Sequence, residues 1–191
     1  TRSSRDRVKD SSQPAAMATL RQAKLGGALI IGLADLAGIW TLEQVTGGVS
    51  ELARRSVDAA LGWLLADAAK RNVFLTDDPT GEALLRHGGL IVLGMGKLGA
   101  EELNYSSDID LIVLFDPEKI EAKRPDRLQH EMVRLTRGLV TMMEELTRDG
   151  YVFRTDLRLR PDPASTPMAL SVDAAEVYYE SAGQNWERAA M

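Results

Sequence analysis

One continuous stretch, residues 88–116, constrains the fold of this chain more than any other. It reads GGLIVLGMGKLGAEELNYSSDIDLIVLFD and predicts a strand, a glycine turn, a short helix and a second strand. Residues 90–93 form an apolar, β-branched-rich run that ends at a glycine, which is typical of a buried strand. The alternating apolar positions of residues 109–115 indicate a second strand with one buried face.

Three glycines lie between the two predicted strands, at Gly94, Gly96 and Gly99. Because glycine has no Cβ, such a turn can bring backbone N–H groups close to a ligand, and a helix that follows it presents its positive end to phosphate. Lys97 would add a positive charge. We therefore expect nucleotide phosphate to contact Gly96, Lys97 and Gly99. Ser107 is expected mainly to turn the chain into the next strand, and it could also reach a phosphate.

Two carboxylates, Asp108 and Asp110, open the second predicted strand. Residues two apart in a strand share a face, so the two charges point the same way and repel each other. A divalent cation relieves this repulsion, because Mg²⁺ takes oxygen ligands and is commonly held by one or two carboxylates and substrate phosphate oxygens. A glycine turn beside an Asp-x-Asp pair therefore predicts phosphoryl or nucleotidyl transfer. A solvated or capping pair at a strand edge is the structural alternative.

A third carboxylate lies in residues 151–160, whose alternation predicts a further strand. On one predicted face, Asp156 lies among Arg154, Arg158 and Arg160. The planar guanidinium suits phosphate oxygens, so we expect Arg158 and Arg160 to bind phosphate. Taken alone, Asp156 could equally well form an ion pair with a neighbouring arginine.

The residues before this region predict helices. Residues 1–14 are polar and charged and predict a mobile tail, and residues 15–71 predict a helical region with helices at about 15–38 and 42–70. Gly47 and Gly48 could divide the second of these helices. Residues 72–87 predict a linker rich in turn formers.

The catalytic core is expected at residues 88–191, with the helix at 42–71 packed on it. Asp126 is predicted to cap a long helix that ends at Arg148, with apolar residues up to Leu146 on its buried face. A loop is expected at 161–167. A short helix is expected from Ser171 to Gly183, and the start of another at 186–191.

The composition excludes several classes of protein. The 191 residues carry a formal charge of -5, which argues against a generally basic nucleic-acid-binding protein. The chain has no cysteine, so disulfides and thiolate metal sites are excluded. No apolar run approaches the length of a membrane span, and the amino end lacks a secretory pattern. We therefore expect a cytoplasmic protein that binds neither nucleic acid nor membrane.

Three separated motifs carry a resemblance to known enzymes. They are GMGKLGAEELNYSSDIDLIVLF, DGYVFRTDLRLRP and YYESAGQNWERAAM, in this order along the chain. The first resembles the signature of the polymerase-beta-like nucleotidyltransferase superfamily. Together they resemble the bacterial glutamine synthetase adenylyltransferase/adenylyl-removing family, which is more specific than any single motif. One departure is Ala100, where the family frequently has glycine, and alanine is the better helix former there.

The resemblance implies an α+β fold in which a small mixed sheet flanked by helices forms a nucleotidyltransferase core, with an extra amino-terminal helical layer. It implies that Asp108, Asp110 and Asp156 are catalytic and hold two Mg²⁺ ions, for which Mn²⁺ could substitute. The wording at SSDIDLI, DLRLRP and WERAAM is similar to the amino-terminal, adenylyl-removing half of the family. That half uses phosphate to remove AMP from a tyrosine of adenylylated glutamine synthetase, releasing ADP, whereas the other half attaches AMP from ATP.

The resemblance also implies a role in nitrogen regulation through the PII signal protein and glutamine. Because the family commonly continues with a basic segment after WERAAM, it further implies a core truncated at its carboxyl end.

Two other classes of function stay open. Residues 94–99 are a literal G-x-G-x-x-G, and Asp116 follows at about the ~20-residue distance of a dinucleotide-binding oxidoreductase domain. The adjacent charges of Asp108 and Asp110 argue against that interpretation, because burying them without a partner would be costly. The other class is a non-catalytic module that docks glutamine synthetase or PII.

Overall fold

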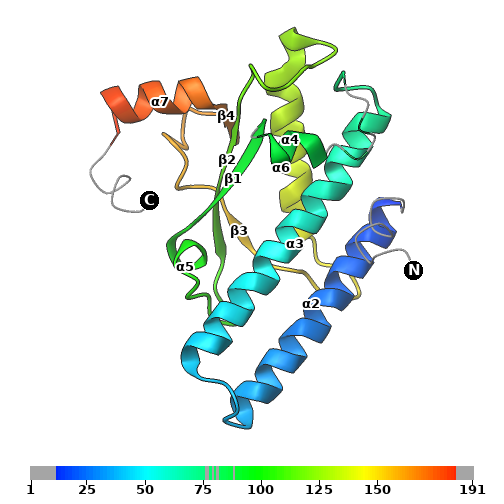
Figure 1. Cartoon of the computed structure of the whole chain (residues 1–191), viewed down its shortest axis with the longest axis vertical. Coiled ribbons are helices and arrows are strands. Elements are labelled where there is room, and N and C mark those ends of the chain that lie inside the picture. The colour runs from blue at the N-terminus through cyan, green and yellow to red at the C-terminus, as the bar shows by residue number, and fades with distance from the viewer. Residues whose placement is uncertain (1–11, 76–77, 79, 81, 88, 184–191) are drawn as a thin grey trace.

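The structure is a computed structural model that describes residues 12–75, 78, 80, 82–87 and 89–183 (Figure 1). Within these residues, a small mixed sheet is packed with helices. In chain order the elements are α2 (Gln13–Leu36), α3 (Leu42–Lys70), α4 (Glu82–Arg86), β1 (Leu90–Met95), α5 (Gly96–Gly99), β2 (Ile109–Phe115), η1 (Pro125–Arg127), α6 (Leu128–Glu144), β3 (Thr155–Asp156), β4 (Ala169–Ser171) and α7 (Val172–Ser181). The architecture is the predicted combination of helices with a small mixed sheet.

The sheet is built around β2. β1 lies antiparallel to β2, whereas β3 and β4 both run parallel to it, β3 at the start of β2 and β4 at its end. The alternating apolar positions of β2, residues 109, 111, 113 and 115, are all buried as predicted. Because β1 and β2 are antiparallel, the G-x-G-x-x-G turn does not join two parallel strands of a βαβ unit. The dinucleotide-binding interpretation is therefore wrong.

The two long amino-terminal helices agree with the sequence prediction except at one point. α3 runs unbroken through Gly47 and Gly48, so the predicted division of this helix is wrong. Thr41 and Gln44 exchange side-chain to backbone hydrogen bonds in a capping box that fixes the start of α3. α3 packs against both α2 and α6, and α2 lies on the outside as the predicted extra helical layer (Figure 1).

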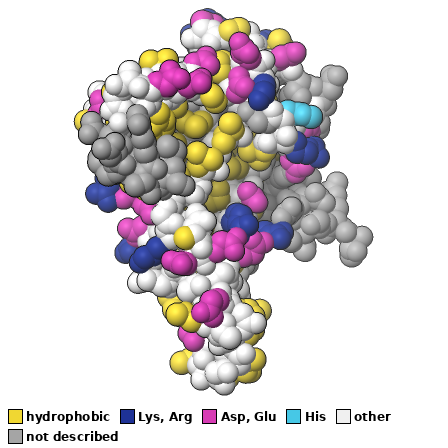
Figure 2. Space-filling model, turned by 60° about the vertical axis from the view of Figure 1, so that its left-hand side comes forward, with side chains coloured by type: hydrophobic (Ala, Val, Ile, Leu, Met, Phe, Trp, Pro, Cys, Tyr) yellow, Lys and Arg dark blue, Asp and Glu magenta, His cyan; other side chains and the backbone are white. Residues whose placement is uncertain are grey.

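α2 has two faces of different character. Met17, Leu20 and Ile31 are buried, but the leucines whose spacing predicted the helix are 58–87% exposed: Leu25, Leu29, Leu33 and Leu36. Figure 2 shows hydrophobic side chains at the narrow end of the molecule, where α2 joins α3. The spacing correctly predicted a helix without identifying the face that packs.

Among the described residues, no helix has the length and apolar character needed to cross a membrane.

The start of α6 differs from the prediction that Asp126 caps it. Pro125–Arg127 forms a 3-10 turn, and α6 begins at Leu128 without a side-chain cap. Asp126 instead pairs with Arg124 at 3.1 Å. Proline at the first position of the 3-10 turn starts the helix here, because its fixed φ suits a helical turn and its missing N–H is not needed.

The carboxyl end of α6 was predicted too late, at Arg148. The helix ends at Glu144, and Leu146 is 77% exposed rather than buried. Beyond the helix, Thr147 and Gly150 exchange backbone hydrogen bonds in a tight turn, and Gly150 has a φ of +83°. The turn reverses the chain toward the sheet, which the helical spacing of the apolar residues could not reveal.

The predicted strand at 151–160 is also wrong for most of its length, because only Thr155–Asp156 is strand. Val152 and Phe153 are neighbours in sequence and both are buried, which strict alternation does not allow. The Val152 N–H donates to the carbonyl of Met143 in α6 at 2.8 Å. The chain thus follows α6 before it joins the sheet, and this long-range packing overrides the local pattern.

The predicted short helix after the 161–167 loop is confirmed as α7. The Ser171 hydroxyl accepts a hydrogen bond from the Ala174 N–H at 3.2 Å and so caps its start. The sequence did not predict that the residues just before α7 would form strand β4. The predicted helix start at 186–191 and most of the predicted tail at 1–14 lie outside the described residues.

Candidate functional site

The three predicted aspartates lie at one end of the sheet, although residues 108 and 156 are far apart in sequence. Asp110 on β2 is paired in register with Asp156 on β3, and on its other side with Met95 of β1. Asp108 directly precedes β2, where the Ile109 N–H donates to the carbonyl of Arg154 at 2.9 Å. The parallel pairing of β2 with β3 is therefore what brings the third carboxylate to the first two.

The glycine turn lies against the same carboxylates. Gly96 has a φ of +53°, and a Cβ built on it would lie 3.0 Å from Oδ2 of Asp110. A Cβ on Gly99 would lie 2.6 Å from the carbonyl oxygen of Gly94, closer than real contacts allow. Both positions therefore require glycine for geometric reasons. α5 has only four residues, so phosphate binding by a helix end, as the sequence suggested, gains no support from it.

Asp110 is the electrostatic centre of the group. Burial raises the pKa of its carboxyl above the ordinary range, and the negative charges of Asp156 and Asp108 raise it further. The positive charges of Arg158 and Lys97 act in the opposite direction. Asp110 thus interacts with four of the predicted site residues. Because its pKa is raised overall, an additional positive charge nearby would stabilise its ionised form.

Each of the other two aspartates already has an arginine partner. Arg158 binds Asp156 in a fork, with its Nε 2.9 Å from Oδ2, and this contact holds the pKa of Asp156 below its usual range. Arg154 donates from Nε to Oδ1 of Asp108 at 2.5 Å and from Nη2 to the carbonyl of Ser106 at 3.0 Å. The ion pair considered for Asp156 is therefore present. Arg154, absent from the predicted phosphate ligands, also belongs to the group.

Arg160 and Ser107, both predicted to contact phosphate, are engaged elsewhere. The Arg160 guanidinium donates to the backbone carbonyls of Leu157, Pro163, Thr166 and Pro167. Burial lowers the pKa of Arg160. It therefore secures the loop between β3 and β4. Ser107 exchanges hydrogen bonds with Asn104, donating to its side-chain oxygen at 2.8 Å, and shapes the turn before β2, the role the sequence favoured for it.

The group fits a metal site by its chemistry but is not assembled as one. Among the described residues, no three acidic or histidine side chains converge closely enough to hold a metal ion. The physical reason is that Asp108 and Asp156 are turned toward Arg154 and Arg158. Three carboxylates at one sheet end, one of them with a raised pKa, still form the oxygen-only donor set that suits Mg²⁺ or Mn²⁺.

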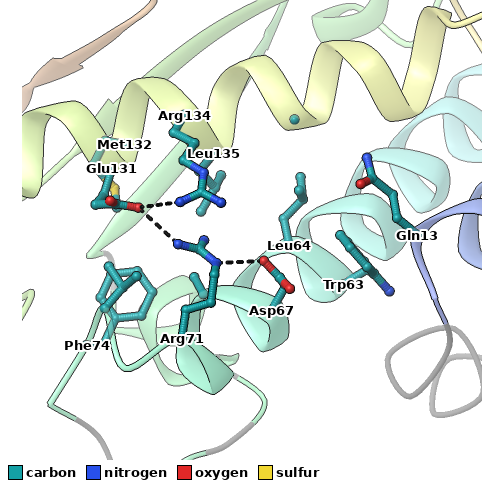
Figure 3. A pocket seen from close by; sticks show the side chains of 13 residues that line it. Gln13, Trp63, Leu64, Asp67, Arg71, Phe74, Glu131, Met132, Arg134 and Leu135 are labelled. Atoms are coloured by element: carbon teal, nitrogen blue, oxygen red, sulfur yellow. Dashed lines mark hydrogen bonds and ion pairs between the residues drawn. The ribbon is translucent and has the colours of Figure 1, made fainter.

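A separate cavity of about 380 Å³ lies between α3 and α6, and it includes none of Asp108, Asp110 and Asp156 (Figure 3). Its charged residues bind one another: Arg71 pairs with Asp67 at 2.8 Å and with Glu131 at 3.3 Å. Arg134 approaches the same Glu131 carboxylate at 3.8 Å. Because these charges are mutually neutralised, the cavity offers no unbalanced group for phosphoryl chemistry.

Comparisons with known proteins agree with the motifs. A family model described as glutamate-ammonia ligase adenylyltransferase matches residues 3–191. A curated protein of Rhizobium meliloti (strain 1021) is 49% identical over 175 residues, which are 92% of this chain and 18% of the relative. One from Rhodopseudomonas palustris (strain ATCC BAA-98 / CGA009) is 49% identical over 181 residues, 95% of this chain and 18% of the relative.

A third relative, from Bradyrhizobium sp. (strain BTAi1 / ATCC BAA-1182), is 47% identical over 194 residues and covers 100% of this chain and 19% of its own length. All three are named bifunctional glutamine synthetase adenylyltransferase/adenylyl-removing enzyme. The chain spans less than a fifth of the length of these relatives.

Proposed function

Because the chain belongs to the glutamate-ammonia ligase adenylyltransferase family, we propose that it carries the adenylyl-removing centre of a bifunctional enzyme. In the proposed reaction, an oxygen of orthophosphate attacks the phosphorus of AMP-tyrosine on glutamine synthetase. The bond between that phosphorus and the tyrosine oxygen breaks. The products are ADP and the tyrosine, whose phenolate takes up a proton.

The observation that carries this proposal is the register of β2 and β3. It sets Asp110 beside Asp156, with the Gly96 turn against the Asp110 carboxylate. A small mixed sheet that collects three carboxylates next to a glycine turn is what a polymerase-beta-like nucleotidyltransferase core requires. We therefore assign this fold to the sheet and its flanking helices.

Asp108, Asp110 and Asp156 are the residues that would hold divalent cations. Such cations, when bound, neutralise charge on the transferred phosphoryl group and on the attacking and leaving oxygens. Burial and then the negative charges of Asp156 and Asp108 raise the pKa of Asp110, and these two charges make cation binding favourable at this position. Mg²⁺ is the expected ion, with Mn²⁺ as a substitute.

The positive side chains orient the phosphates. The Arg158 side chain is 83% exposed, so its guanidinium can exchange the Asp156 carboxylate for a phosphate oxygen without unburying itself. Lys97 lies beside the glycine turn and acts on Asp110, so its ammonium is placed to bind the same phosphates. The backbone N–H groups near Gly96 would complete the cradle, since no Cβ blocks them.

The direction of the reaction rests on the wording of the motifs. SSDIDLI, DLRLRP and WERAAM are similar to the adenylyl-removing half, whereas the other half usually reads closer to GYGKLGG and GSDLDLV. The alternative is the half that attaches AMP from ATP to glutamine synthetase, since both halves use the same apparatus. Control by the PII protein and glutamine, and a cytoplasmic location, complete the proposal by analogy with the family.

The test is an assay of the full-length protein with adenylylated glutamine synthetase, Mg²⁺ and orthophosphate. We expect ADP release that requires phosphate and is lost in Asp108→Asn, while the thermal midpoint of the variant shows that the fold is retained. Transfer of AMP from ATP without ADP release from the adenylylated substrate would assign this chain to the other half. Phosphate-dependent release that survives in Asp108→Asn would overturn the assignment of the site.

A further inference from the structure

We propose that Glu144, the last residue of α6, is a positioning residue for Asp156. It does not touch Asp156 itself but holds the neighbouring residue, Thr155, through two hydrogen bonds. The inference rests on the proposed function for its kinetic consequence, although the contact is independent of the reaction. Neither the sequence motifs nor the names of the relatives assign a role to this glutamate.

The contact is a double one. Oε1 of Glu144 accepts a hydrogen bond from the backbone N–H of Thr155 at 2.5 Å and another from its hydroxyl at 2.6 Å. Hydrogen bonds to a charged acceptor are stronger than those between neutral groups. Because Thr155 donates from both its backbone and its side chain, the two bonds fix the position and the orientation of the backbone at this residue. The next residue along this backbone is Asp156.

β3 needs such a support because it is very short. It contains only Thr155 and Asp156 and forms an edge of the β1-β2-β3 order. On the side of β2, the Arg154 carbonyl accepts from the Ile109 N–H at 2.9 Å. The Thr155 N–H is directed to Glu144 instead. Glu144 therefore accepts the backbone N–H of Thr155, which no neighbouring strand accepts, and holds β3 on the side away from β2.

The end of α6 that carries Glu144 is itself anchored. Arg21 of α2 is 1% exposed, and its guanidinium donates to the carbonyls of Met142 at 3.1 Å and Gly150 at 2.7 Å, and also to that of Glu145. A buried guanidinium with several backbone acceptors is a rigid connection. The packed helices thus fix the position of Asp156 through Glu144 and Thr155. The surface loop that precedes Asp156 does not.

The exact placement of Asp156 matters because its partner across the strands is Asp110. A group that must act together with a second carboxylate loses effect when its backbone shifts by a fraction of an ångström. Removal of Glu144 would leave β3 held mainly by its short pairing with β2. The expected effect is on the rate of the bound complex rather than on substrate binding.

The experiment compares Glu144→Ala with Glu144→Gln in the full-length enzyme. Glutamine keeps an oxygen acceptor in the same place, so it should retain both hydrogen bonds. We expect Glu144→Ala to lower kcat for phosphate-dependent ADP release by about 10–100-fold, the usual effect of losing a supporting contact, with KM for adenylylated glutamine synthetase unchanged. Glu144→Gln should restore kcat to within a few-fold of wild type. The matched control is Glu176→Ala, which removes an exposed carboxylate from another helix, α7.

A second measurement needs no turnover. Hydrogen exchange of the Thr155 amide should accelerate in Glu144→Ala and stay slow in Glu144→Gln, while the thermal midpoints of both variants stay close to wild type. Thr155→Val, which removes only the hydroxyl, should give an intermediate loss of kcat. If Glu144→Ala leaves both kcat and Thr155 exchange unchanged, or if glutamine fails to rescue, the proposal is wrong. If wild type releases no ADP but the exchange results hold, the proposed function fails and the positioning role stands.

Discussion

Arginines in two regions of this protein differ in burial and in the groups that they bind. Arg21 is buried and donates to backbone carbonyls of α2, α6 and the turn that follows α6. Arg154 and Arg158 are 58% and 83% exposed at their side chains and pair with the carboxylates of Asp108 and Asp156. Arg21 is closed off from solvent, whereas the guanidinium groups of Arg154 and Arg158 are open to it.

This difference separates an arginine that holds the fold from the arginines of the proposed site. Removing Arg21 would take a hydrogen-bond donor from the backbone carbonyls of Met17, Met142, Glu145 and Gly150, which costs folding free energy. The surface ion pairs contribute little to stability, because water screens them and their formation restricts long side chains. The proposed site therefore predicts that substitutions at the acidic end of the sheet change activity strongly and folding weakly, whereas substitutions of Arg21 do the opposite.

The largest effect is expected for Asp156→Asn. If the aspartate acts in catalysis, the variant should lose about 10³-fold in turnover, which corresponds to about 4 kcal/mol of barrier. Its thermal midpoint should stay near that of wild type. Asp126→Asn is a matched control, since Asp126 also pairs with an exposed arginine two residues away, at 3.1 Å. Equal turnover in the two variants would remove Asp156 from the catalytic group.

Arg21→Met should show the opposite pattern. We expect a loss of about 3 kcal/mol in the free energy of unfolding, because four backbone carbonyls each lose a hydrogen bond to a buried guanidinium. For a chain of this size the midpoint should fall by roughly 6–12 °C. Gln22→Met, at the exposed neighbouring position of α2, should change the midpoint little. A midpoint for Arg21→Met like that of this control would show that the buried arginine does not secure α6.

Asp110→Asn should separate stability from function within the site. The folded-state pKa of Asp110 is raised, so ionisation costs more in the folded chain than in the unfolded one. Wild type should therefore lose stability as pH rises through this pKa. The variant should melt at a higher temperature than wild type at neutral pH, and this difference should vanish at acid pH. The variant should also lose turnover. Thermal melts across pH decide this, and a variant that is less stable at neutral pH would contradict the account.

The smallest effect is expected on the outer face of α2. Leu33 is 58% exposed, so Leu33→Asp in this 191-residue chain should change the free energy of unfolding by at most about 0.5 kcal/mol. Ile31, two residues away and 5% exposed, is the contrast, and Ile31→Ala should cost about 2–5 kcal/mol. Denaturant melts of the two variants measure the difference. A large loss in Leu33→Asp would mean that this face is covered in solution.

The sequence predicted those features that depend on neighbours along the chain. The strand–turn–strand order of residues 88–116, the buried face of β2 and the capped start of α7 follow from local spacing, and all three are confirmed. The antiparallel pairing of β1 with β2 was not deduced from the pattern, although it decides against the dinucleotide-binding fold. Pairing direction depends on the path of the chain between the strands rather than on their composition.

The errors occur where distant residues decide. The end of α6 and the course of residues 151–154 are set by the turn at Gly150, by Arg21 and by the Val152 bond to Met143. The contacts of Arg21 and Val152 have no local signal in the sequence. At the candidate site, the structure brings together the predicted aspartates and Arg158, whereas the donors of Arg160, also predicted to bind phosphate, are occupied by loop carbonyls. Glu144 had no motif and emerged only from its contact with Thr155.

The proposed function depends on divalent cation binding by three carboxylates, at the start of β2 and in β3. The most direct measurement is Mn²⁺ binding by the full-length protein, followed by electron paramagnetic resonance, for wild type and Asp110→Asn. We predict saturable binding to wild type and fewer bound ions per molecule in the variant, because this site loses a carboxylate while the other half of a bifunctional enzyme keeps its own site. The same number of bound ions with the same affinity in both proteins, or none in wild type, would contradict this proposal.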